Sequence, residues 1–173
     1  QTHDLSNAAI SRVDVTTFAQ AAALYAGVTD TTSQAQYSLP FALAVRMVHG
    51  AIGPSHITAQ GLRDPDVAAA LSKITVQEAA RHSNRFPLGR WSDVTVHTTA
   101  GKQFHSGDVH ARGGPEAPMS MQEIEAKFHI MAAFLPDARR TALWQMKDML
   151  LKPDVLFSDL LALVHPAIDA RYG

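Results

Sequence analysis

The chain has 173 residues, of which 46% are apolar, so it can bury the core of at least one domain and is not expected to be disordered. Its 15 basic residues nearly balance its 16 acidic residues and leave a formal net charge of -1, which argues against non-specific binding of nucleic acid or anionic lipid. The absence of cysteine excludes disulfide bonds, thiolate catalysis and cysteine-ligated metal centres.

The first elements in chain order are a strand and a buried helix. Over residues 10–18, Ile10, Arg12, Asp14 and Thr16 alternate with Val13, Val15 and Thr17, which predicts a strand with the first set on a solvent-facing side and the second on a β-branched side. Residues 39–50 place apolar side chains at helical spacing and end in glycine, which predicts a mostly buried helix with a left-handed stop. Two starts of this helix remain open: Ser33 caps a helix that kinks at Pro40, or Ser38 caps a helix with Pro40 in its first turn.

The middle of the chain predicts a short helix and three further strands. Asp64 followed by proline is a strong N-cap signal for a helix over Pro65–Leu71. Ile74–Glu78 has the character of a strand. Residues 93–98 and 103–106 alternate in polarity and are joined by a glycine turn, so they are predicted to form an antiparallel hairpin.

Only helical signals follow the break at residues 113–115. Ser120 and Glu123 have the spacing of a capping box, and apolar residues at steps of three and four follow them, which predicts a helix. Pro136 and Pro153 precede two further helices, the first predicted to include the apolar residues Leu143, Met146, Met149 and Leu150 and the second Leu156, Leu160, Leu161 and Val164. We therefore predict an α+β fold, with a small antiparallel sheet and helices over residues 1–114 and a helical C-terminal tail over residues 115–173.

The nine histidines do not form a recognisable metal motif. No pair has the spacing of H-E-x-x-H, and His105 and His110 lie five residues apart, so no metal site is predicted. His97 and His105 are expected to face each other across the hairpin on its solvent side. His49 precedes the helix stop, where an interaction with the negative end of the helix dipole is the favoured interpretation and a position in a pocket is the alternative.

One cationic segment interrupts the nearly neutral chain. Arg81, His82, Arg85 and Arg90 surround Phe86 and Pro87, and a solvated loop is the favoured interpretation. The alternative is attraction of a polycarboxylate substrate. No nucleophile elbow, phosphate-binding glycine loop or dinucleotide-binding motif is present, so acyl transfer and nucleotide chemistry have no support.

No targeting or membrane signal is found in the sequence. No segment approaches the roughly 20 consecutive apolar residues of a membrane helix. Residues 1–10 lack the basic and apolar regions of a signal peptide. Together with the lack of cysteine, these features predict a soluble, cytoplasmic protein.

Several segments, in their order along the chain, resemble one known family. They are AQYSLPFALA at residues 35–44, DPDV at residues 64–67, RGGPEAPMS at residues 112–120 and EAKF at residues 125–128. This set resembles the C-terminal part of the MmgE/PrpD family, which includes 2-methylcitrate dehydratase, cis-aconitate decarboxylase and iminodisuccinate epimerase. The third segment departs from the family pattern, because Gly114 and Ala117 stand where the family has aspartate and asparagine.

The resemblance implies that this chain is one part of a larger enzyme. Family members have a large all-helical domain, followed by a smaller lid-like α+β domain whose last helices return to the helical domain. Residues 1–114 would form the lid-like domain, and residues 115–173 would pack on the helical domain. Most acid-base groups of the family lie in that preceding domain, so this chain alone is expected to be inactive. The resemblance also implies a homodimer.

The implied chemistry is proton transfer next to a carboxylate of a small di- or tricarboxylic acid, with no metal or organic cofactor. A dehydratase like that of 2-methylcitrate is favoured, with an epimerase or decarboxylase of the same family, or a non-catalytic interaction module, as alternatives. Gln36, Tyr37, Ser38 and Arg112 are the expected substrate-binding residues, although a helix cap would also explain the first three. No catalytic residue is assigned. Neither nucleic acid nor a membrane is an expected partner.

Overall fold

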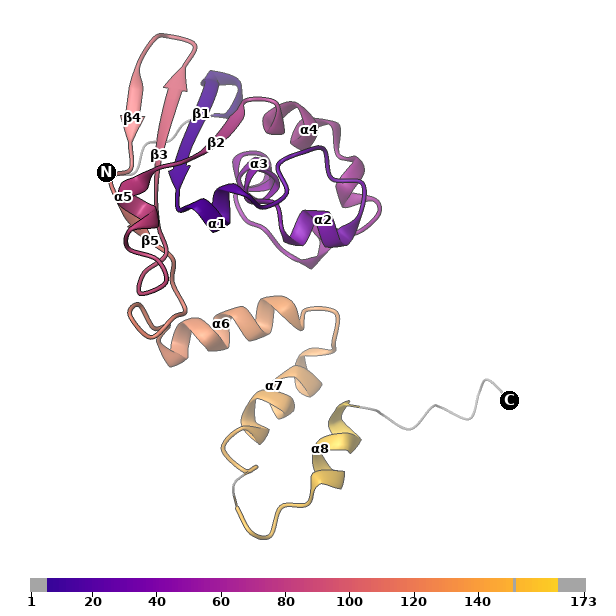
Figure 1. Ribbon diagram of the computed structural model, residues 1–173. Coiled ribbons are helices and arrows are strands. Elements are labelled where there is room, and N and C mark those ends of the chain that lie inside the picture. The colour runs from indigo at the N-terminus through magenta and orange to yellow at the C-terminus, as the bar shows by residue number, and fades with distance from the viewer. Residues whose placement is uncertain (1–5, 151, 165–173) are drawn as a thin grey trace. The chain divides into compact units, whose positions relative to one another are not determined.

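The computed structural model describes residues 6–150 and 152–164, and the chain divides into two compact units between Pro118 and Met119. The first unit combines a five-stranded sheet with short helices, and the second is helical in its described part (Figure 1). This composition confirms the predicted α+β class.

The sheet of the first unit has the strand order β2-β1-β3-β4, and β5 also pairs with β3. Its strands are β1 (Ile10–Thr17), β2 (Ile74–Glu78), β3 (Trp91–Thr98), β4 (Gln103–His105) and β5 (Val109–His110). β3 is antiparallel to β1, β4 and β5, whereas β1 and β2 are parallel. The sheet is therefore mixed and not purely antiparallel as predicted, because the long helical connection between β1 and β2 returns the chain to the same end of the sheet.

The alternation predicted for β1 is present, with one exception at its start. Val13, Val15 and Thr17 are buried, and Arg12 is exposed. Ile10 was expected on the same side as Arg12 but is buried, because a register shift between these two residues marks a β-bulge that turns Ile10 toward the core. The buried side of the sheet is thus continuous up to the first residue of β1.

The hairpin of β3 and β4 is confirmed, but its register differs from the one expected. His97 lies opposite Gln103, and His105 lies opposite Thr95 and hydrogen-bonds it through Nδ1 at 2.9 Å. His97 and His105 are therefore diagonal neighbours and do not face each other. The turn uses Gly101 at a φ of 76°, a conformation that side chains rarely adopt.

Helix α3 (Leu39–His49) covers the buried side of the sheet. Its N-cap is Ser38, whose hydroxyl accepts the Phe41 N–H at 3.2 Å, and Pro40 lies in its first turn. The residues before it form a separate short helix, α2 (Thr32–Gln36), so the second of the two predicted starts is correct. The cap and the proline together fix where α3 begins.

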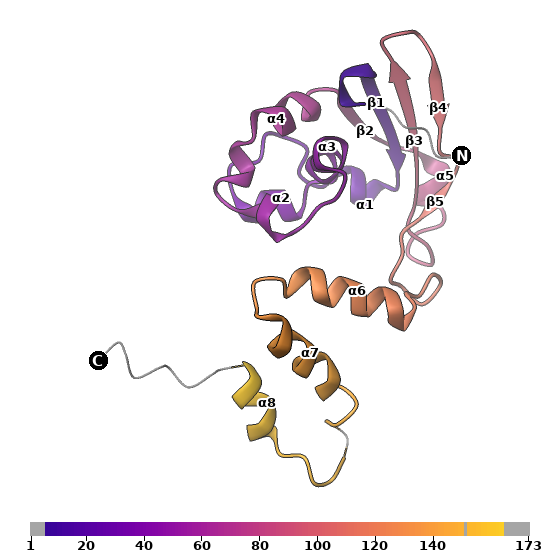
Figure 2. The ribbon, with the colours of Figure 1, turned by 180° about the vertical axis from the view of Figure 1, so that it is seen from behind.

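Two apolar clusters lie on opposite sides of α3. On one side Leu39, Leu43 and Met47 pack against the buried side chains of β1. On the other side Phe41 and its neighbours pack against α4 (Pro65–Leu71). Figures 1 and 2 show α3 between the sheet and α4. The core of the first unit is built around this helix.

The remaining elements of the first unit are short: η1 (Asn7–Ala9), α1 (Ala19–Ala22), η2 (Pro54–Ile57), η3 (Gly61–Arg63) and α5 (Ala80–Ser83). The second unit contains α6 (Met121–Met131), α7 (Asp137–Met146) and α8 (Phe157–Val164). The predicted capping box at the start of α6 is confirmed, since Ser120 and Glu123 bond each other's backbone N–H groups. Met149 and Leu150, expected within α7, follow its end. Within the described ranges, none of the helices has the length and apolar character needed to cross a bilayer.

Candidate functional site

Three of the expected binding residues lie in one turn between α2 and α3. Gln36 ends α2, Tyr37 follows it and Ser38 caps α3. Ser38 is 3% exposed, whereas Tyr37 is 63% exposed and its side chain is accessible to a ligand. The cap interpretation is confirmed for Ser38, and substrate binding by this turn stays a prediction.

Arg112, the fourth expected binding residue, lies in another part of the first unit. It is exposed in the loop that follows β5, whereas the turn at Tyr37 lies between two helices. The structure therefore does not bring Arg112 into that turn, and its role also stays a prediction.

The cationic segment at residues 81–90 is ion-paired with the sheet region. Arg81 donates a hydrogen bond to Asp93 of β3, and Arg85 donates one to Asp108. The solvated loop expected here is instead a segment held by carboxylates of the same unit. The charges of Arg81 and Arg85 are compensated in this way, which argues against their use in attracting a polycarboxylate.

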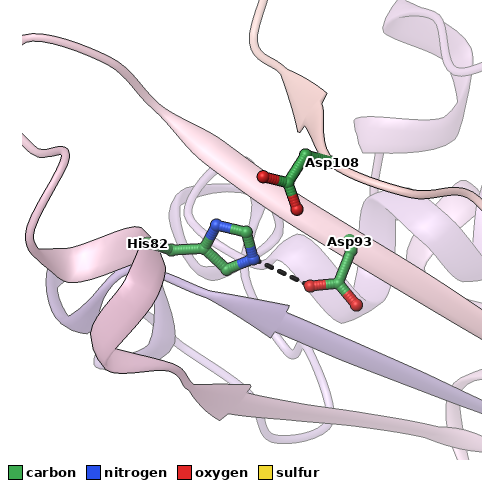
Figure 3. A group of neighbouring side chains, drawn as sticks. All are labelled: His82, Asp93 and Asp108. Carbon is green, nitrogen blue, oxygen red and sulfur yellow. Dashed lines mark hydrogen bonds and ion pairs between the residues drawn. The ribbon is translucent and has the colours of Figure 1, made fainter.

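Asp93 contacts several residues of this network, and Figure 3 shows its contact with His82. Its Oδ2 atom lies 2.7 Å from Nε2 of His82, which is fully buried in α5. The same oxygen accepts hydrogen bonds from the hydroxyl of Thr16, its neighbour across the β1–β3 pair, and from Arg81. Burial raises the pKa of Asp93, but the hydrogen bonds from His82 and Thr16 and the charge of Arg81 outweigh this effect and hold the pKa below its usual value.

His82, Asp93 and Asp108 are residue types that can bind a metal ion, and they lie close together. Their potential ligand atoms lie within 4.8 Å of one another, which is close enough to share an ion. However, Arg81 contacts Asp93 and lies 3.9 Å from Asp108, and Arg85 also contacts Asp108. A divalent cation would have to compete with both guanidinium groups for the carboxylate oxygens. The arrangement fits an ion-pair network better than a metal centre.

A second set of polar residues lies around a concave surface beside the end of α3, which encloses a volume of about 980 Å³. His49 lies in the last turn of α3, as the favoured interpretation requires, and also lines this surface. Its Nε2 atom lies 2.8 Å from Oδ2 of Asp64, and its ring stacks on His56 with centroids 4.8 Å apart. The hydrogen bond from His49 and those from the backbone N–H groups of Val67 and Asp66 lower the pKa of Asp64.

Several residues of these two groups were not singled out in the sequence. The sequence indicates only weakly that Asp93 is part of a polar cluster, because the alternation of β3 places it on the same polar side as Thr95 and His97. Asp108 and His56 lie in irregular or 3₁₀ segments, where no periodic pattern assigns a side chain to a face. Only the folded structure shows which carboxylate each arginine or histidine side chain contacts.

A sequence comparison agrees with the family resemblance of the segments described above. A model of the MmgE/PrpD C-terminal domain matches residues 1–150, which includes the Tyr37 turn, the ion-pair network and the concave surface. A comparison with curated proteins finds no match. Since the matched range is most of the chain, this protein belongs to the MmgE/PrpD family and contains its C-terminal domain.

Proposed function

We propose that this chain is the C-terminal part of a MmgE/PrpD-type enzyme that acts on a small di- or tricarboxylic acid by proton transfer next to a carboxylate. The observation that carries the proposal is the family match over residues 1–150. Residues 1–114 act as the lid-like domain, and residues 115–173 pack on a preceding helical domain. The lack of cysteine supports a cytoplasmic location.

The favoured reaction is the dehydration of a 2-methylcitrate-like acid. A base removes the proton from the carbon next to a carboxylate, and an acid protonates the departing hydroxyl group. A carbon–carbon double bond forms and water leaves. The preceding helical domain supplies the base and the acid, while the lid excludes water from the reacting groups and strengthens the hydrogen bonds that hold the substrate. Epimerisation or decarboxylation on the same scaffold is the alternative reaction.

The turn at Gln36–Ser38 is the part of the lid that we propose contacts the substrate. Ser38 anchors the turn, because it is buried and its hydroxyl holds the first turn of α3. Tyr37 therefore projects from a fixed backbone, with an exposed phenol that can donate a hydrogen bond to a carboxylate. Gln36 beside it adds a further donor, and we propose that Arg112, which lies outside this turn, binds the substrate from the loop after β5. Anchored donors lose little conformational entropy when the substrate binds.

The apolar surface of the second unit supports association with another domain. Large exposed side chains occur along it: Met121, Ile130, Met131, Phe134 and Leu161. Contiguous apolar patches mark surfaces that bind other polypeptides, and these exposed side chains within one small helical unit support such a surface. The same surface would serve a non-catalytic interaction module, so it does not by itself distinguish the two functions. We propose that it contacts the helical domain in a homodimeric enzyme.

The test combines this chain with its preceding helical domain and assays three reactions: dehydration of 2-methylcitrate, decarboxylation of cis-aconitate and epimerisation of iminodisuccinate. We expect one of the three activities to require both parts. A complex that forms but is inactive on all three acids would overturn the enzymatic proposal.

Tyr37→Phe tests the proposed binding turn within that complex. We expect kcat/KM to fall about tenfold to a hundredfold, because a hydrogen-bond donor to the substrate is lost. Tyr25→Phe is the matched control, since the Tyr25 hydroxyl donates to the Val28 carbonyl within its own loop. Equal activity of the two variants would remove Tyr37 from the site.

A further inference from the structure

The concave surface beside the end of α3 has no part in the proposed reaction. Its lining includes the polar side chains of His49, His56, Gln60, Arg63 and Asp64, and its volume of about 980 Å³ is large enough for a small molecule. We propose that this surface binds a small multivalent oxyanion that carries carboxylate or phosphate groups. The inference does not depend on the proposed function, because binding can be measured without catalysis.

His56 is oriented as a hydrogen-bond donor. The backbone N–H of Gly53 donates to Nδ1 of His56 at 2.9 Å, so Nδ1 carries a lone pair and the neutral ring carries its proton on Nε2. Nε2 of His56 has no hydrogen-bond partner in the part of the chain that the structure describes. Stacking on His49 at 4.8 Å fixes the plane of the ring. The surface thus holds a positioned N–H that a ligand oxygen can accept.

Arg63 supplies the positive charge. Its side chain is exposed, lines the surface and makes no hydrogen bond or ion pair with any residue of the ranges described. A guanidinium group binds carboxylate and phosphate through two parallel hydrogen bonds. Arg63 therefore differs from Arg81 and Arg85, whose charges are compensated within the chain.

Asp64 is the acidic residue that lines this surface, and it already accepts hydrogen bonds from other groups of the chain. Its Oδ1 atom accepts the N–H groups of Asp66 and Val67 at 2.9 and 3.3 Å, and its Oδ2 atom meets His49 at 2.8 Å. Repulsion between this carboxylate and an incoming anion is weakened by these three contacts. The exposed side chain of Arg63 is therefore the charge that is more accessible to a ligand, since the side chain of Asp64 is only 25% exposed.

The backbone that carries these groups is tightly packed. Thr58 donates to the Ser55 carbonyl at 2.9 Å and accepts the Gly61 N–H at 3.1 Å, which closes the loop between His56 and Arg63. A Cβ atom at Gly61 would lie 2.6 Å from the carbonyl oxygens of Ser55 and His56, so the chain approaches itself there as closely as glycine allows. The backbone that carries the donors is thus held in place before a ligand arrives.

In the test, anions are titrated into a solution of the full chain at constant ionic strength, and binding is monitored by the chemical shifts of the backbone amides in NMR spectra. Citrate is the probe for carboxylates and inorganic phosphate is the probe for phosphate groups, with sodium chloride as the reference. We expect saturable shifts in the amides of residues 53–64 with at least one probe. The probe that saturates at the lower concentration identifies the class of anion. Shifts that grow linearly with both probes, as with chloride, would overturn the proposal.

Two variants separate a specific site from general charge attraction. Arg63→Gln is expected to weaken binding about tenfold, because it removes the paired hydrogen bonds and the charge. Arg46→Gln is the matched control, since Arg46 is an exposed residue of α3 that does not line the surface, and it should change binding less than about twofold. If both variants weaken anion binding equally, the binding is due to non-specific electrostatic attraction and the proposal is overturned. Both side chains are exposed, so neither change threatens folding.

Discussion

His82 and Asp93 form a hydrogen bond of 2.7 Å between Nε2 and Oδ2, and the imidazole that makes it is fully buried. Asp93 lies on β3 and is itself only 18% exposed in its side chain, while His82 belongs to the helix that follows β2. The Nδ1 atom of His82 has no hydrogen-bond partner among the described residues. The contact with Asp93 is thus the interaction that compensates the burial of this ring.

We predict that Asp93→Asn destabilises the chain by about 2 kcal/mol, because it leaves the buried ring of His82 without its anionic partner and removes the shorter of the two ion pairs of Arg81. Asp108→Asn is the matched control. The side chain of Asp108 is 42% exposed, so its loss should cost less than about 1 kcal/mol. Urea unfolding followed by circular dichroism measures both changes. Equal destabilisation by the two variants would show that the buried contact with His82 adds no more to the free energy of unfolding than an exposed ion pair does.

The lowered pKa of Asp93 predicts how stability depends on pH. The folded chain holds this carboxyl below its unfolded pKa, so the stabilisation is fully present above about pH 4 and is lost as the pH falls through the folded value. We expect the difference in unfolding free energy between the wild type and Asp93→Asn to shrink from pH 6 toward pH 3. Urea unfolding at several pH values measures it. A difference that stays constant over this range would contradict the prediction.

The elements that the sequence predicts well are those specified by neighbouring residues. Ser120 and Glu123 are three positions apart, and Asp64 directly precedes the helix that it caps. The alternation along β1 and β3 likewise needs only adjacent positions. Such signals act within one turn or one strand, so their physical cause is contained in a short window of sequence.

Pairings over long distances in the chain could not be predicted in the same way. The direction of β2 depends on the path of the whole helical connection between residues 18 and 73, and no local pattern encodes that path. His97 and His105 were misassigned because a different register across the hairpin changes which side chains are opposite. The partners of Arg81 were missed for the same reason, since Asp93 reaches it only after β3 has paired with β1.

The cap of α3 gives a second test of stability. Ser38→Ala removes the acceptor for the Phe41 N–H and leaves that group buried without a partner, so we expect a loss of about 1 to 2 kcal/mol. Ser33→Ala is the matched control, because Ser33 is exposed within α2 and should change stability by less than about 0.5 kcal/mol. Thermal unfolding of the two variants measures the difference. A larger loss of stability for Ser33→Ala would instead support the alternative in which Ser33 caps a helix that kinks at Pro40.

Phe41 tests the packing of α3 against α4. It is 1% exposed, and truncation to alanine both removes apolar contact and leaves a cavity, which predicts a loss of about 3 to 5 kcal/mol. Phe41→Leu keeps most of the volume and should cost about half as much or less. Urea unfolding of both variants provides the comparison. Equal losses would mean that the site depends on an aromatic ring and not on filled volume.

Phe134 tests the apolar surface of the second unit. It is 83% exposed and follows the end of α6, so Phe134→Ser should leave the unfolding free energy of the isolated chain within about 0.5 kcal/mol of the wild type. If this surface binds the preceding helical domain, the same change should weaken their complex at least about tenfold, because a large aromatic side chain is lost from a desolvated interface. Calorimetric titration of the two parts measures the affinity, and Leu88→Ser is the control, since Leu88 is equally exposed at 81% but belongs to the first unit. An affinity that Phe134→Ser leaves unchanged would place the contact with the helical domain on another surface of the chain.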